Sequence, residues 1–149
     1  MRYSADMIFA SALLTIVLAA LPAEKAAATV QATDSPVRLD RAMVLSGAEG
    51  PPVLLYSATN VTDDALDQFT VIAFIFNAEG TLKARQTAPG RRTLDPHGTK
   101  YSTLVLDGSA IEASDQIVVG VNQAQRVNSD AWWRSDIQPA AEAAVKKKK

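Results

Sequence analysis

Residues 69–77, with the sequence FTVIAFIFN, limit the fold of this chain more than any other segment. They are rich in β-branched and aromatic side chains and lead into a Gly-containing turn at residues 78–80, so they predict a central β-strand. Phe69, Val71, Ala73 and Ile75 lie on one face of this strand, and Thr70, Ile72, Phe74 and Phe76 lie on the other. Both faces are apolar, whereas a strand with one face in water alternates apolar and polar residues. The second face therefore needs either a cover or a partner.

Short strand-like segments separated by turn signals fill the rest of residues 37–134. We expect strands at residues 37–45, 53–60, 81–87, 100–106 and 116–122, with Gly- and Pro-containing turns between most of them. No segment before Pro139 repeats apolar residues with the period of a helix. This spacing predicts an all-β, immunoglobulin-like β-sandwich of about seven short strands, with the strand order left open.

The N-terminus has the pattern of a secretory signal peptide, which we assign to residues 1–28. Its apolar segment, residues 7–21, is shorter than the ~20 residues that a membrane-spanning helix needs, so an uncleaved anchor is the less favoured alternative. Ala26-Ala27-Ala28 offers small residues for cleavage, and Leu21-Pro22-Ala23 and Val30-Gln31-Ala32 are alternative sites. We therefore expect an exported protein, periplasmic or extracellular, with a linker at residues 29–36.

Composition excludes several kinds of site. The chain has no cysteine, which excludes disulfides, thiol catalysis and zinc–thiolate centres. Its net charge of −1 becomes −5 without the four C-terminal lysines, and an acidic body argues against nucleic-acid binding.

Residues 135–149 are expected to be a disordered tail, because so short an alanine-rich helix is marginal alone. At about 1 kcal/mol each, the lysines allow at most weak contact with an anionic membrane surface, and a solubility tag is the other explanation. These lysines are Lys146, Lys147, Lys148 and Lys149.

Three motifs resemble the FxLYD-type domains of bacterial exported proteins. The strand ending at Asn60 leads into a polar turn, with Ser57 near the place where the family usually has glycine. Residues 75–80, IFNAEG, resemble the family's aromatic-aromatic-Asp-x-x-Gly turn, with Asn77 in the acidic place. Residues 94–98, LDPHG, precede a further strand. The resemblance covers residues 53–122 and implies a small β-sandwich without a general enzymatic activity.

His97 is the only histidine and lies in a Pro-His-Gly loop. Asp95 and Ser102 are near it in sequence, but no nucleophile-elbow motif accompanies them, and a single histidine cannot form a multi-histidine metal site. A nearby acidic cluster lacks the spacing of a calcium-binding loop, which favours a solvated turn. This cluster consists of Asp63, Asp64 and Asp67. We therefore expect no enzymatic activity, no metal site and no cofactor.

Trp132 and Trp133 are the most prominent pair outside the expected strands. Neighbouring residues of a strand point to opposite faces, so only one of them can enter the core. We hypothesise that one tryptophan covers the outer face of the central strand. If nothing covers it, that face is an apolar patch for a partner.

The sequence thus predicts a non-catalytic binding domain with an unknown ligand. The expected partner is a protein of the cell envelope or a second copy of the chain. The alternative is a structural or accessory envelope domain with no ligand of its own, and a hydrolase using His97 is third. The candidate binding residues are Ile72, Phe74, Phe76, Trp132, Trp133 and His97.

Overall fold

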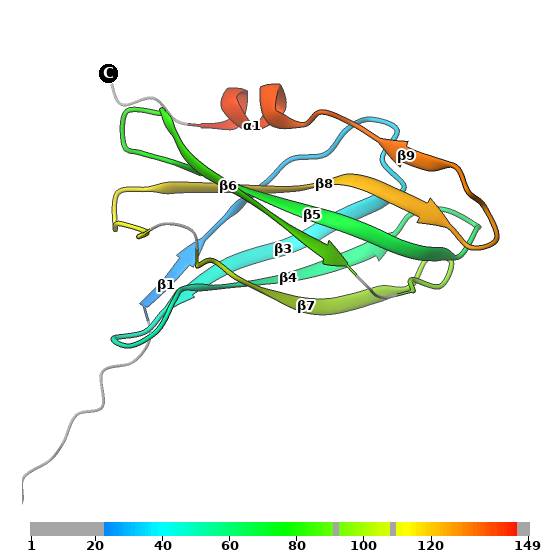
Figure 1. Ribbon diagram of the computed structural model, residues 1–149, viewed down its shortest axis with the longest axis horizontal. Helices are drawn as coiled ribbons and strands as arrows, with labels where there is room; N and C mark the ends of the chain where they lie inside the picture. The colour runs from blue at the N-terminus through cyan, green and yellow to red at the C-terminus, as the bar shows by residue number, and fades with distance from the viewer. Residues whose placement is uncertain (1–22, 91–92, 108–109, 146–149) are drawn as a thin grey trace, which may run out of the picture.

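The computed structural model describes residues 23–90, 93–107 and 110–145. Two β-sheets pack face to face, which confirms the expected all-β sandwich (Figure 1). The first sheet has the order β1 (Ala23–Ala26), β3 (Val37–Ser46), β4 (Val53–Asn60) and β7 (Thr99–Val105). The second sheet has the order β2 (Ala28–Thr29), β8 (Gln116–Arg126), β5 (Leu66–Phe76) and β6 (Leu82–Gly90), and β9 (Trp132–Arg134) also pairs with β8. One short helix, α1 (Gln138–Ala144), follows the last strand.

The strand order differs from that of an immunoglobulin domain. In such domains the second strand lies between the first and the fifth. Here β3 pairs with β4, the next strand along the chain, and β4 then pairs with β7. The description as immunoglobulin-like therefore fits the two-layer architecture but not the connectivity.

The N-terminal residues 23–29 belong to the sandwich. β1 pairs antiparallel with β3 in the first sheet, and β2 pairs parallel with β8 in the second, so the chain passes from one sheet to the other. The backbone N–H of Val30 continues this pairing at 2.9 Å from the carbonyl oxygen of Val119. A leader that ended at residue 28 would include β1 and the first residue of β2, and the expected linker contains buried Ser35 and Pro36. Residues of the expected leader and linker thus pack with the two sheets, and the expected boundaries at residues 28 and 36 stay a prediction. The first 22 residues of the expected leader lie outside the described residues.

The main core lies between the two sheets. The inner face of β5 supplies Phe69, Val71, Ala73 and Ile75, as its alternation predicts. The first sheet faces them with Leu54, Tyr56 and Ala58 of β4, among others. The observed β5 begins at Leu66, three residues before the predicted start, because Leu66 pairs across the sheet with Arg126 and forms a bridge with Leu94.

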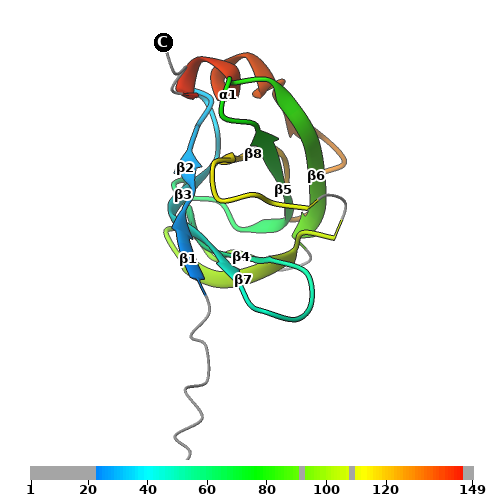
Figure 2. The same cartoon turned by 90° about the vertical axis from the view of Figure 1, so that its left-hand side faces the viewer.

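Helix α1 covers the outer face of the second sheet (Figure 2). Ile137, Ala141 and Val145 are buried, and their spacing of four residues places them on one side of the helix. They form a second apolar cluster with Ile72, Phe74, Phe76 and Val118. The prediction of a flexible tail is therefore wrong for residues 137–145, because packing on an apolar sheet stabilises a helix that is too short to persist alone. Residues 146–149 lie outside the described residues. No helix in the described part of the chain is long and apolar enough to cross a membrane.

Candidate functional site

The outer face of β5, which we nominated as a binding surface, is enclosed by the chain itself. Phe74 and Phe76 are 1% and 0% exposed, and Ile72 is also buried. Their cover is α1 together with the partly buried Val30 and Ala32. This finding corrects the expectation of a partner site at these residues.

The two tryptophans point in different directions from β9. Trp133 packs against the core between the sheets. Trp132 lies under the guanidinium of Arg134, which is 6.0 Å from its ring centroid. Neither residue is part of the cluster under α1, so the hypothesis that a tryptophan covers the outer face of β5 is wrong.

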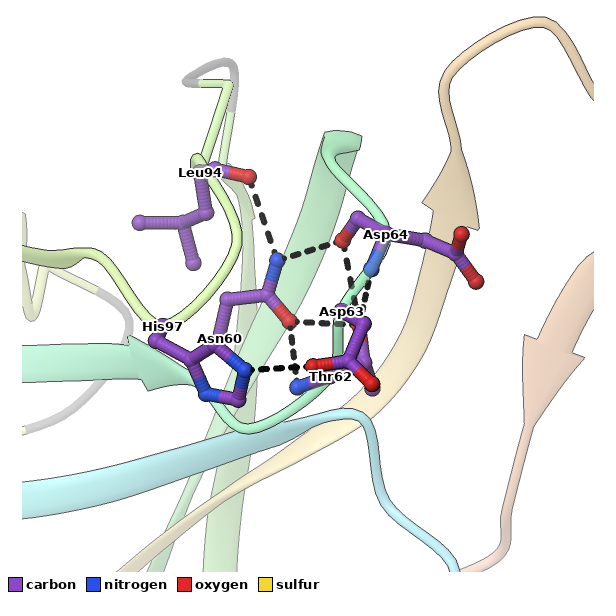
Figure 3. Close-up of polar contacts among 6 residues, drawn as sticks. All are labelled: Asn60, Thr62, Asp63, Asp64, Leu94 and His97. Atoms are coloured by element: carbon purple, nitrogen blue, oxygen red, sulfur yellow. Dashed lines mark hydrogen bonds and ion pairs between the residues drawn. The ribbon is translucent and has the colours of Figure 1, made fainter.

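His97 lies at an exposed loop tip with a positive φ of 58°. Its Nε2 atom is 2.7 Å from Oδ1 of Asp63, and both side chains are mostly in water (Figure 3). Within the described residues, no hydroxyl group hydrogen-bonds to His97. The described residues also contain no group of three or more acidic, histidine or cysteine side chains that could hold a metal ion.

Asn60 is the buried centre of the same region. Its Nδ2 atom donates to the carbonyl oxygens of Asp64, at 2.7 Å, and Leu94, at 3.2 Å. Its Oδ1 atom accepts from the backbone N–H and the hydroxyl of Thr62, at 3.0 and 2.8 Å (Figure 3). Asn60 thus joins the end of β4, the β4–β5 turn and the segment before β7. Both amide hydrogens are used, which leaves no room for a glycan at this Asn-x-Thr sequence.

The outer face of the first sheet is the surface that the sequence reading missed. Cross-strand partners share a face, and Leu55 of β4 pairs with Met43 of β3 and Thr103 of β7. Ser57 likewise pairs with Arg41 and Tyr101. These six residues line a shallow pocket of about 440 Å³, and we call them the first-sheet face. They are Arg41, Met43, Leu55, Ser57, Tyr101 and Thr103.

This face is apolar and open to solvent. Met43 is 38% exposed and Tyr101 is 77% exposed. Val105, at the end of β7, is 45% exposed beside them. Within the described chain, no helix or loop covers this sheet as α1 covers the other one. The alternation of β7 was visible in the sequence, but either of its two faces was apolar enough to be the buried one.

Arg41 gives the first-sheet face its charge. Its guanidinium is exposed, and no carboxylate in the described residues forms an ion pair with it. The nearby Asp40 is instead paired with Arg38 Nε at 2.6 Å and accepts a hydrogen bond from Thr59 Oγ1. Burial raises the pKa of Asp40, but the hydrogen bonds from Thr59 and Arg38 outweigh it and hold the pKa below its usual value. Arg41 is therefore free to meet an acidic group of a partner.

A buried carboxylate lies away from these surfaces, where β6 meets the segment before β8. The side chain of Asp115 is fully buried and accepts hydrogen bonds from Lys83 Nζ, at 2.6 Å, and the backbone N–H of Glu112, at 2.8 Å. The hydrogen bond to Asp115 raises the pKa of Lys83 above 10.5, although desolvation opposes it. The pair links the β5–β6 hairpin to the loop between β7 and β8.

Lys83→Met is expected to destabilise the protein at neutral pH, because it leaves the buried carboxylate of Asp115 without its cation. A lysine with a raised pKa contributes stability that is fully present below about pH 10.5 and is lost as the pH rises further. The stability difference between wild type and variant should therefore stay constant up to about pH 10 and shrink above pH 10.5. Urea denaturation across this pH range measures it. Lys25→Met, which removes a bond to a backbone carbonyl, is the control, and an unchanged difference at high pH would contradict the assignment.

No family model, curated protein or solved structure matches this chain. The resemblance to FxLYD-type domains therefore stays a prediction.

Proposed function

We propose that this protein is an exported, non-catalytic binding domain that holds a protein of the cell envelope on its first-sheet face. One observation carries the proposal: this sheet keeps an apolar, solvent-exposed outer face, while the equivalent face of the other sheet is covered by α1. Soluble monomers seldom leave apolar patches open without a use. The proposal moves the binding surface from Ile72, Phe74 and Phe76 to the opposite side of the sandwich.

The chemistry of the face describes its partner. Met43, Leu55 and Tyr101 offer apolar contacts in the pocket, and Ser57 and Thr103 also line it. Arg41 is the one charged side chain that lines it. The fitting partner is a protein segment with an apolar side chain next to a carboxylate. Arginine and tyrosine are also the residues that most often dominate binding energy at protein interfaces.

Export is the second part of the proposal, and the leader-like N-terminus supports it. Cleavage after Ala23, at Leu21-Pro22-Ala23, would leave nearly all of β1 in the mature protein. Cleavage after Ala28 would remove β1 and expose the edge of β3. The first site is therefore the one that agrees with the fold. The resemblance to exported bacterial domains supports export itself.

An accessory envelope domain without a ligand is the second candidate. The observation in its favour is that α1 closes the face of the central sheet that seemed open in the sequence. A hydrolase has no comparable support, because the exposed pair of His97 and Asp63 has no hydroxyl group bonded to it within the described residues.

In-cell photocrosslinking tests the proposal. A photoreactive residue at Met43, on the first-sheet face, is expected to capture one dominant protein. The matched control is a photoreactive residue at Thr87, an exposed position on β6 in the other sheet. The product is taken from the exported fraction and sequenced from its N-terminus, where Glu24 is expected as the first residue. No product at Met43, or the same products at both positions, would overturn the binding proposal, and a sequence starting at Thr29 would overturn the cleavage site.

A further inference from the structure

Strand β7 ends the first sheet with an open edge. It lies along the lower border of the domain in Figure 1, and its one strand partner in the described chain is β4. The backbone N–H of Leu106 donates to the carbonyl oxygen of Pro52, and the backbone N–H of Asn60 donates to the carbonyl oxygen of Gly98. The backbone N–H and C=O groups of the even-numbered residues of this segment therefore point toward β4. Backbone groups alternate in direction along a strand. The N–H and C=O groups of Thr99, Tyr101 and Thr103 therefore point outward from the sheet.

The edge strand β6 of the second sheet is protected against pairing in ways that β7 is not. The β5–β6 register shifts between Ile75 and Phe76, which leaves Lys83 as an extra residue in a bulge. Arg85 adds a second charge, and Pro89 has no N–H to donate. Bulges, charges and prolines are the usual protection of an edge strand against pairing. β7 has a regular register with β4 along its whole length and contains no proline.

We propose that β7 pairs with β7 of a second copy of this chain, antiparallel and about a two-fold axis at Tyr101. The geometry selects this register. Hydrogen-bonded pairs must join outward-facing residues, and Gln86 Nε2 already caps the carbonyl of Val105 at 2.6 Å. The carbonyl oxygen of Val105 is therefore already bonded. The outward N–H and C=O groups of the other residues pair when Thr99 faces Thr103 and Tyr101 faces Tyr101. This register forms about six backbone hydrogen bonds.

The side chains also agree with self-pairing. The two copies of Tyr101, each 77% exposed in the monomer, become a cross-strand aromatic pair. Lys100 is the one charged residue of β7, and it lies opposite Ser102 rather than a second Lys100. Its ammonium group is turned back to the carbonyl of Thr93. No like charges are therefore brought together, which is what an isologous interface requires.

The dimer joins two four-stranded sheets into one continuous sheet. The two first-sheet faces then lie side by side on a single surface. The inference does not depend on the proposed function, since it rests on the edge of β7 rather than on the pocket. An extended peptide of another protein is the competing occupant of the same edge.

Mixed single-cysteine variants test the register, because the chain has no native cysteine. Thr99→Cys and Thr103→Cys are purified separately, mixed and oxidised gently. In the proposed register residues 99 and 103 of different copies are about 5.5 Å apart between Cα atoms, within the range of a disulfide. Identical positions are four residues out of line, about 13 Å apart, and cannot form one. The mixture is expected to give a covalent dimer, and each variant alone is expected to give none.

Every outcome decides the proposal. Sedimentation of the untouched protein should show its mass approaching twice the monomer mass as the concentration rises. A disulfide in Thr103→Cys alone or Thr99→Cys alone would replace the register with one centred on that residue. A wild-type protein that stays monomeric, with no disulfide in the mixture, would overturn the dimer and leave the edge to a peptide of another protein.

Discussion

Replacing Gly120 by valine is expected to lower the free energy of unfolding by about 3 kcal/mol. Gly120 lies on β8 under the chain that covers the second sheet. A Cβ atom at this position would be 2.4 Å from Cδ1 of Ile137 and 2.8 Å from the carbonyl oxygen of Val30. The isoleucine side chain could turn away, but the second contact is with backbone, so the cover must move as a whole.

The main consequence should be a loosened α1. When Ile137 is displaced, the apolar cluster under the helix opens to water, and a dye such as ANS is expected to bind where Phe74 and Phe76 become exposed. Chemical denaturation and dye fluorescence measure the two effects. Gly47→Ala is the matched control, because the nearest atom to a Cβ there is at an ordinary 3.5 Å. Equal stability of Gly120→Val and the wild type would show that α1 does not rest on this position.

Replacing Asn60 by alanine is expected to cost about 2 to 3 kcal/mol of stability. The side chain is fully buried and binds three backbone groups, two in the β4–β5 turn and one at Leu94. Removal of the side chain leaves the N–H of Thr62 without its acceptor. The carbonyl oxygen of Asp64 also loses one of its hydrogen-bond donors. Loss of these bonds should also loosen the loop that carries His97, because the next link between that loop and β4 is the single bond from Asn60 N to Gly98 O.

Asn77→Ala provides the comparison for this prediction. Asn77 also accepts two backbone N–H bonds, from Glu79 and Thr81, but it lies in a half-exposed turn where water can replace it. Its loss is expected to cost about 1 kcal/mol. Urea denaturation of both variants, with hydrogen exchange at residues 94–98, measures the difference. If the two variants are equally stable, burial does not make the hydrogen bonds of Asn60 contribute more to stability than those of Asn77.

Much of the fold was predictable because strands leave a local signal. The strand at residues 53–60 has the bounds that its turn-flanked apolar run predicts, and the central strand differs by a few residues at its start. Alternation also assigned the inner face of β5 correctly. The extension of β8 to Arg126 was not predictable, since it depends on pairing with the first residues of β5, far earlier in the chain, and with β9.

The candidate site was predicted on the wrong sheet. An apolar residue pattern shows that a face must be covered, but it does not show what covers it. Ile72 and Phe74 have the same pattern whether their neighbour is a tryptophan, another protein or a helix. The cover is a helix with only three buried side chains, too few for a periodic signal.

By itself the sequence determined the properties that depend on neighbouring residues: the β class, most strand bounds, the two-sided burial of β5 and the absence of any thiol chemistry. The tertiary structure alone decided which sheet stays open. This choice depends on contacts between Gly120, Ile137 and Val30, residues that are far apart in the chain. It also decided that residues 23–29 belong to the sandwich, because their short, alanine-rich sequence forms strands only when β3 and β8 supply hydrogen-bonding partners.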